Sequence, residues 1–470
     1  MINKLLWVFI EKGGITLLQF ATLIILGRIL TPIDYGVYGI MMIVIAVSDM
    51  LVDSGFGGAL VYKKKIEQLD INTLFIVNIT ISLVLYVAII VFSPLLERYY
   101  KIDNLSLYLR VLGSTIIFFA LSQVQNALVI RNLEFKKSAI INILAVVLSS
   151  LIAIILANKG YGVWSLIIQS ITNSLLVSFF LWVTSKTKIN IAFSRQSLKF
   201  LWGFGSNLLF ANILQTIVNN ISTSIIPKIG SVTQSGHFFQ ASKLSNIPIN
   251  IITVSIDKFS FPILTKEREI ISLKYKARNI NRFFFLFFAP LFPLLSYTSK
   301  PLISLILGSK WEPVSVYFSL LCWSGIGLLI QCLYRNFLKS LGRTRYIMYV
   351  EIIKSILTLA GLFICACFGV KYLVVCIVFM SYIGAIIWGF CIKKQLNLTY
   401  HEQIMDILKP LLSLSCTYLL LQMIPISNDS YFRFVLGMLS YFVYLSLNYI
   451  MKQDDLVILY NKYSAKIFKK

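Results

Sequence analysis

Long apolar spans recur from one end of this sequence to the other, and they constrain the fold more than any other feature. A helix needs about 20 mainly apolar residues to cross roughly 30 Å of hydrocarbon. Of the 470 residues, 58% are hydrophobic and only 13% are charged. A transmembrane barrel would show short alternating strands instead, and the sequence lacks that pattern. We therefore expect an all-α, polytopic membrane protein.

Hydropathy and helix-breaking residues together predict about fourteen transmembrane helices. No predicted connection is longer than about twenty residues, so we expect no soluble domain. Pro290 and Pro293 lie inside the ninth span and predict a kink there. The predicted spans are 5–30, 35–60, 71–93, 105–130, 138–158, 161–184, 198–227, 235–261, 281–300, 313–334, 345–367, 370–392, 406–425 and 432–451.

The turn after the first predicted helix returns later in the chain. The residues that match at an offset of 200 positions are Arg28 and Lys228, Thr31 and Ser231, Gly36 and Gly236, and Tyr38 and Phe238. This offset covers six helices, an even number, so the second copy starts on the same side of the membrane as the first. The pattern predicts two parallel six-helix repeats with a pathway between them near the midplane. We expect a lobe at 1–190, a lobe at 195–395, and two extra helices with a basic tail at 400–470.

The basic residues behind the net charge of +24 are concentrated in the segments on one side of the predicted membrane. If the N-terminus is cytoplasmic, the cytoplasmic segments carry 28 Lys and Arg residues and the opposite side carries 10. Short loops rich in Lys and Arg stay on the cytoplasmic side. Both termini are therefore predicted to be cytoplasmic, and the basic surplus requires no nucleic acid or other anionic partner.

The residues that usually carry catalysis or bind metals are scarce and scattered. There are two histidines, His237 and His401, and neither has a cluster of partners nearby in sequence. All seven cysteines fall within apolar spans, and Cys365 and Cys367 lack the spacing of a zinc site. The pattern favours a transporter over an enzyme, with no cofactor and no metal.

Ionisable residues inside the spans are the best candidates for function, because a charge in lipid is costly unless it faces a cavity or a partner. Asp49 is expected either to serve a cavity and ion coupling or to make a structural hydrogen bond. Asp53, beside a glycine-rich stretch, either takes part in gating or braces the helix end. Glu351 and Lys354 are three residues apart and either contact the substrate pathway or neutralise each other.

The seventh predicted helix is rich in amide side chains. Asn212, Gln215 and Asn219 follow one another at about one helical turn. Amides at this spacing can line a water-filled path and bind sugar hydroxyls. They can equally make hydrogen bonds between helices.

Three features of the sequence are similar to those of a known family. They are the segments LGRILTPIDYGVYGI and DSGFGGALVYKK and the plan of six, six and two helices. The chain resembles the Wzx-type polysaccharide flippases of the multidrug/oligosaccharidyl-lipid/polysaccharide exporter superfamily. The resemblance implies alternating access in a bacterial cytoplasmic membrane, with undecaprenyl-pyrophosphate-linked oligosaccharides as substrate for O-antigen, capsule or exopolysaccharide. It also implies contact with membrane lipids and makes other polysaccharide-assembly proteins candidate partners.

A diphosphate in a membrane cavity must be paired with cations. The basic residues inside the predicted spans are Lys243, Lys354, Arg28 and Arg110. We expect the two lysines to lie deeper and the two arginines nearer the outer side. A second interpretation pairs Lys354 with Glu351 and has the other three cations reaching lipid headgroups. The lipid II flippases of the superfamily carry arginines in helix 1, and this chain departs from them, with no Arg or Lys between Lys12 and Arg28.

Two other classes of protein stay open. A drug or cation exporter of the same superfamily would have the same fold. A membrane glycosyltransferase or O-antigen polymerase would typically carry its functional residues on a large outer loop, and the predicted outer loops here are short.

Overall fold

The structure, a computed structural model, describes residues 2–53, 56–63, 66–185, 187, 189–190, 192–264, 269–424 and 432–450. The side chains of a few residues within helices, Asn212 among them, lie outside this description. The chain forms two compact units, residues 1–239 and 240–470, and each is described by itself. The three-part division at 190 and 400 stays a prediction.

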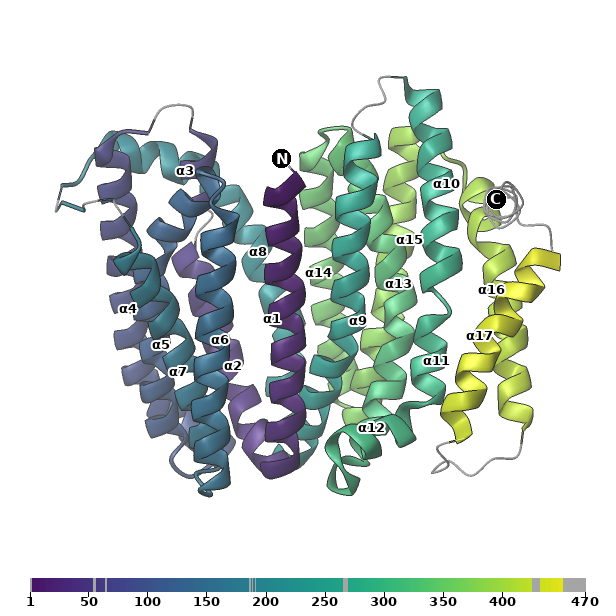
Figure 1. The fold of residues 1–470 in the computed structure, drawn as a ribbon, viewed down its shortest axis with the longest axis horizontal. Coiled ribbons are helices and arrows are strands. Elements are labelled where there is room, and N and C mark those ends of the chain that lie inside the picture. The colour runs from purple at the N-terminus through teal and green to yellow at the C-terminus, as the bar shows by residue number, and fades with distance from the viewer. Residues whose placement is uncertain are drawn as a thin grey trace. The chain divides into compact units, whose positions relative to one another are not determined.

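The first unit is a bundle of helices joined by short connections (Figure 1). Its helices are α1 Ile2–Ile29, α2 Pro32–Asp53, α3 Phe56–Tyr62, α4 Gln68–Tyr100, α5 Leu105–Arg131, α6 Phe135–Asn158, α7 Val163–Val183 and α8 Arg195–Ile229, followed by the first residues of α9 Val232–Leu264.

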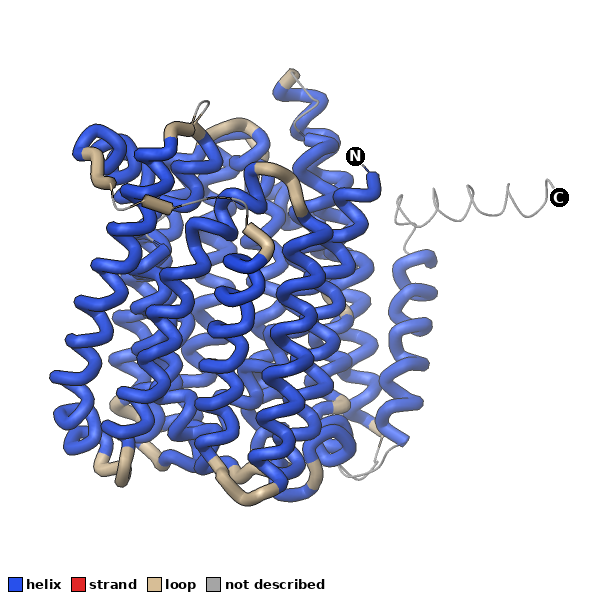
Figure 2. Tube along the Cα trace, turned by 60° about the vertical axis from the view of Figure 1, so that its left-hand side comes forward, coloured by secondary structure: helices blue, strands red, loops and turns tan. Residues whose placement is uncertain are grey.

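The second unit contains the rest of α9 and the remaining helices. They are α10 Ile270–Phe288, α11 Leu291–Tyr297, α12 Ser299–Leu307, α13 Val314–Ser340, α14 Thr344–Ala366, α15 Val370–Leu396, α16 Tyr400–Met423 and α17 Phe432–Ile450, with a single 3-10 turn at Ser309–Trp311. Within the described residues the chain is drawn as helices and connecting loops without a strand (Figure 2).

Each of the fourteen predicted spans has a helical counterpart, so the all-α polytopic fold is confirmed. Among the described residues, eleven helices are long and apolar enough to cross a membrane. The three remaining predicted spans correspond to α8, α9 and α17. Helix α4 exposes apolar side chains and buries polar ones. Val84, Val87 and Val91 are exposed, whereas Asn78 and Ser82 are buried. A polar interior beneath an apolar exterior is the arrangement that lipid requires.

The observed helices differ from the predicted spans where charge or proline interrupts the apolar pattern. Helix α10 begins at Ile270, well before the predicted start at 281, and α16 begins at Tyr400 instead of 406. The helix is interrupted at Pro290, between α10 and α11, where the sequence predicts a kink. Proline lacks the N–H that would continue the backbone hydrogen bonds of the helix. In Figure 1, α11 lies below α10 on the far side of this break.

Equivalent helices of the two repeats pack in equivalent ways. In the first unit α7 packs against α5 and α6; in the second, α15 packs against α13 and α14. The starts of α2 and α9 are also capped alike. Asp34 accepts a hydrogen bond from the N–H of Thr31 at 2.8 Å, and Gln234 accepts one from the N–H of Ser231 at 3.1 Å. The matched turns in the sequence therefore fold into matched caps.

Candidate functional site

The first candidate site is a chain of polar groups across three helices of the second unit. On α14, Lys354 forms an ion pair with Glu351. The ammonium of Lys354 also donates to Oε1 of Gln331 on α13 at 3.3 Å. Gln331 in turn donates from Nε2 to the carbonyl oxygen of Ser381 on α15 at 2.6 Å. A charge within the bundle is thereby tied to two neighbouring helices.

Two glycines allow α13 and α15 to approach closely enough for this chain. A Cβ atom on Gly384 would lie 2.7 Å from Nε2 of Gln331. A Cβ on Gly327 would lie 2.8 Å from the carbonyl oxygen of Ser381. Small residues at such crossings let backbones approach in membranes. The amide of Gln331 is therefore held between two backbones, with its oxygen directed at Lys354.

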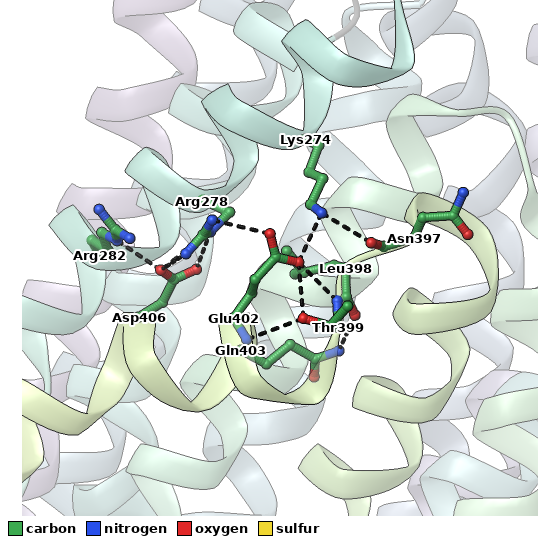
Figure 3. Close-up of polar contacts among 9 residues, drawn as sticks. All are labelled: Lys274, Arg278, Arg282, Asn397, Leu398, Thr399, Glu402, Gln403 and Asp406. Carbon is green, nitrogen blue, oxygen red and sulfur yellow. Dashed lines mark hydrogen bonds and ion pairs between the residues drawn. The ribbon is translucent and has the colours of Figure 1, made fainter.

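A second, larger ionic cluster joins α10 to α16 (Figure 3). Arg278 donates from Nη2 to Oδ1 of Asp406 at 2.8 Å and from Nη1 to Oε1 of Glu402 at 3.2 Å. Arg282 donates from Nε to Asp406 at 2.7 Å, and Lys274 forms an ion pair of 2.7 Å with Glu402. The carboxylate of Asp406 is fully enclosed. A buried carboxylate shared by two guanidiniums holds the two helices together.

This cluster was missed in the sequence, because the predicted helix boundaries excluded most of it. Arg278 lies before the predicted span 281–300, and Asp406 is the first residue of the predicted span 406–425. One signal was present: Arg278 and Arg282 are four residues apart, and so are Glu402 and Asp406. Two such pairs of opposite sign place complementary charges on one face of each of two helices.

Asp49 and Asp53 lie one turn apart on α2 in the first unit. Neither side chain is fully exposed. The buried oxygen Oδ1 of Asp49 has no hydrogen-bond partner among the described residues. Asp53 lies at the end of α2, where a Cβ on Gly57 of α3 would be 3.8 Å from its Oδ1. Asp49 thus has a carboxylate oxygen with unused bonding capacity, and Asp53 lies beside the junction of α2 and α3.

The two predicted outer arginines occupy separate places in the first unit. Arg28 lies in the last turn of α1 with an exposed side chain. Arg110 on α5, also exposed, donates from Nε to Oγ of Ser93 on α4 at 3.1 Å. The structure therefore places each arginine near an end of its helix.

The remaining predicted residues lie on α8 and α9. Gln215 is half-buried and Asn219 is exposed one turn further along α8. The predicted role of Asn212 concerns a side chain outside the description. Lys243 has an exposed side chain on α9 in the second unit. Within the part of the chain that the structure describes, the ion pair of Glu351 and Lys354 brings two of the predicted site residues into direct contact.

The starts of α2 and α9 cross at the two matched glycines, and the contact is reciprocal. A Cβ added to Gly36 would collide with the carbonyl oxygen of Val232. A Cβ added to Gly236 would collide with the carbonyl oxygen of Pro32. Each glycine thus faces the first residue of the other helix, at the offset of 200 that the sequence repeat shows. This crossing lies entirely within the first unit and has local two-fold character.

The fold defines the class of protein. Over 96% of this chain and 99% of the other, it resembles the lipid II flippase MurJ in an inward closed conformation, with a TM-score of 0.79 at 16% identity. An inward-facing MATE family multidrug resistance transporter of the MOP superfamily matches 82% of this chain and 96% of its own, with a TM-score of 0.62 at 16% identity. The chain has the fold of this superfamily of membrane transporters.

The sequence comparison gives the family. Residues 25–316 match the model described as polysaccharide biosynthesis protein, and the chain belongs to this family. The succinoglycan biosynthesis transport protein ExoT of Rhizobium meliloti is 24% identical over 75% of this chain and 72% of its own. The teichuronic acid biosynthesis protein TuaB of Bacillus subtilis is 23% identical over 68% and 67%. The predicted superfamily branch is confirmed, and the chain is a multi-span transporter and not an enzyme.

Proposed function

We propose that this protein flips undecaprenyl-pyrophosphate-linked oligosaccharide repeat units across a bacterial cytoplasmic membrane by alternating access. The observation that carries the proposal is the reciprocal crossing at Gly36 and Gly236. It joins equivalent ends of the two repeats through backbone contact, without a hydrogen bond or ion pair between the glycines. A contact of this kind can separate without leaving a charge unpaired. Membership of a family described as polysaccharide biosynthesis protein supports a saccharide-containing substrate.

The proposed orientation has both termini in the cytoplasm. It rests on the excess of Lys and Arg in the segments assigned to that side. The glycine crossing then lies at the outer end of α2 and α9. Closed, it blocks the outer side while the substrate loads from the cytoplasmic leaflet; opening requires the two glycines to separate.

Lys354 is the proposed diphosphate contact in the second unit. Its ion pair with Glu351 is only partly exposed, 17% for the lysine side chain and 12% for the glutamate. A diphosphate carries more negative charge than one carboxylate and competes for the ammonium, while Gln331 keeps the ammonium in place. Glu351 then acts as a gate that the substrate displaces.

The other candidate residues complete the proposed path. The cations Arg28, Arg110 and Lys243 contact the diphosphate at other stages of its passage. The amides Asn212, Gln215 and Asn219 bind sugar hydroxyls. Asp49, with its unpartnered oxygen, and Asp53 at the α2–α3 junction are the proposed coupling residues.

Deleting the protein tests the substrate. We expect lipid-linked repeat units to form normally and to accumulate on the cytoplasmic leaflet, where an impermeant glycosidase or lectin added from outside does not reach them. Repeat units that fail to form, or that reach the outer leaflet without polymerising, would contradict a flippase.

Cysteine labelling tests the orientation. Single cysteines at Lys137 and Arg345, in a cysteine-free background, should react with an impermeant maleimide only from the cytoplasmic side. Single cysteines at Lys101 and Lys159 should react from outside. Reversed accessibility would overturn the orientation and leave the family unchanged.

One observation favours a drug or cation exporter as the second candidate function. The unpartnered carboxylate oxygen of Asp49 is the kind of group that a cationic substrate requires. This candidate predicts that the deletion strain becomes more susceptible to cationic drugs while polysaccharide is made at the normal level. The flippase predicts the opposite pair of results.

A further inference from the structure

The ionic cluster between α10 and α16 carries one positive charge too many. Its members alternate in sign along the two helices: Lys274, Glu402, Arg278, Asp406 and Arg282. Three cations face two carboxylates. The excess charge lies at the Arg282 end, because Lys274 and Arg278 each reach Glu402 while Arg282 reaches only the carboxylate that it shares.

The two arginines use their guanidinium groups differently. Arg278 donates from Nε, Nη1 and Nη2. Arg282 donates only from Nε, to Asp406, and within the described residues its two terminal nitrogens have no partner. Figure 3 shows this single link between Arg282 and the rest of the cluster. The side chain of Arg282 is 29% exposed whereas that of Asp406 is 0% exposed. Lys274, Arg278 and Glu402 are also 23–25% exposed, but their charged groups are paired with one another. Arg282 therefore combines partial exposure with an unpartnered edge.

The depth of Arg282 in the membrane indicates which ligand can reach its unpartnered terminal nitrogens. Asp406 follows Tyr400, the first residue of α16, by six residues, a rise of about 9 Å. The ring of Tyr400 lies 4.1 Å from the ammonium of Lys393, a pairing typical of the membrane interface. Arg282 lies level with Asp406 and, with a long side chain, is within reach of the headgroups at this end. The anionic groups there are lipid phosphates.

We propose that Arg282 is the anchor of a lipid-phosphate site at the Tyr400 end of α10 and α16. The two terminal nitrogens of a guanidinium match two phosphate oxygens. The nearby carboxylate of Asp406 does not repel the phosphate strongly, since it is enclosed by Arg278 and by Arg282 itself. A phospholipid and a polyprenyl diphosphate present the same chemistry to this edge. The site does not depend on the proposed transport function.

Binding to the full-length protein in neutral detergent tests the site. The probes are dioleoyl phosphatidylglycerol and farnesyl diphosphate in mixed micelles, with inorganic phosphate as the soluble comparison. We expect at least one of the two lipids to bind, and Arg282→Gln to weaken that binding by about tenfold, the loss of one bidentate charged contact. Arg282→Lys should fall between, because it keeps the charge and loses the fork. Preference for one lipid identifies the source of the phosphate.

The matched control is Arg345→Gln, which removes an exposed arginine from the start of α14. It should leave lipid binding unchanged. Equal weakening by both variants, no weakening by Arg282→Gln, or inorganic phosphate binding as tightly as lipid would each overturn the proposal. Asp406 keeps its bonds from Arg278, so Arg282→Gln should fold. If it does not, Arg282→Lys decides: binding as tight as in the unaltered protein contradicts the proposal.

Discussion

Two acids, half-buried Glu11 in the first unit and buried Asp406 in the second, are stabilised in opposite ways. Glu11 on α1 accepts hydrogen bonds from the hydroxyl of Ser138 and the amide of Asn142 on α6, both at 2.8 Å. Asp406 on α16 is instead held by the guanidiniums of Arg278 and Arg282. The partners of Glu11 are neutral, so their charge does not change if it binds a proton. The partners of Asp406 are cations that would be left uncompensated.

The kind of partner determines whether an acid can change its charge. Neutral hydrogen-bond donors hold an acid in place without fixing its charge. Cationic partners fix both the charge and the geometry, because removing one member leaves another charge exposed to a low dielectric. Asp49 in the first unit has even fewer constraints than Glu11. Functional changes of charge are therefore expected at acids such as Glu11 and Asp49, and structural locking where a buried acid is paired with a cation, as between α10 and α16.

The largest expected effect comes from breaking the locked pair. Asp406→Ala should lower the free energy of unfolding by about 3–5 kcal/mol, because two guanidiniums lose their shared carboxylate. Glu11→Gln should cost only about 1 kcal/mol, since the amide oxygen still accepts from Ser138 or Asn142. Equilibrium unfolding in mixed micelles measures both. Equal losses would remove the distinction between the two acids.

The next effect tests the glycine crossing. Gly236→Ala should cost about 1–3 kcal/mol, because the new methyl group meets the backbone of Pro32, which cannot rotate away. Gly13→Ala is the control: a Cβ there meets nothing within 4 Å. As alanine is the better helix former, this control should stabilise by up to about 1 kcal/mol. Changes of the same sign in the two variants would argue against a close crossing.

The Glu351–Lys354 pair should show a smaller effect. Lys354→Gln should cost about 2 kcal/mol, because Glu351 loses its partner, and should reduce flipping. The double change Glu351→Gln/Lys354→Gln should recover most of the stability. If flipping also recovers in the double variant, the pair is structural; if it stays low at normal membrane levels, Lys354 contacts the substrate as proposed.

The smallest effect on stability is expected at Asp49. Asp49→Asn should change the free energy of unfolding by less than about 1 kcal/mol, because its buried oxygen has no hydrogen bond to lose. The same variant should make flipping in proteoliposomes insensitive to pH and to the cation gradient. A large loss of stability without a change in ion dependence would make Asp49 structural, like Asp406.

The sequence predicted the spans and the repeat well, because both depend on local signals. Eleven of the predicted stretches are helices long and apolar enough to cross hydrocarbon among the described residues, and the turns at Thr31 and Ser231 match at several positions. The close crossing of Gly36 and Gly236 is not predicted by this match, because equivalent positions in two repeats need not touch. Neither signal required knowledge of which helices are neighbours.

The sites were harder to predict, because they depend on neighbours. Hydropathy ends a span at the first charged residue, and this rule removed Lys274 and Arg278 from α10. Those charges are tolerated in a helix because α16 supplies carboxylates more than a hundred positions later. The two lysines predicted to form the deeper pair also differ in their surroundings: Lys354 is paired with Glu351, whereas Lys243 is exposed on α9.

The long interval between Arg282 and Asp406 has a consequence for biosynthesis. The two residues are 124 positions apart, so at 5–20 residues per second the ribosome needs roughly 6–25 s to reach the second after the first. During that interval the cations of α10 have no carboxylate from α16. The nascent helix should therefore wait at the membrane surface, with its charges in water, and complete its insertion when α16 emerges. A ribosome stalled between α15 and α16 should leave Arg282 open to water-soluble reagents, and release of the stall should protect it.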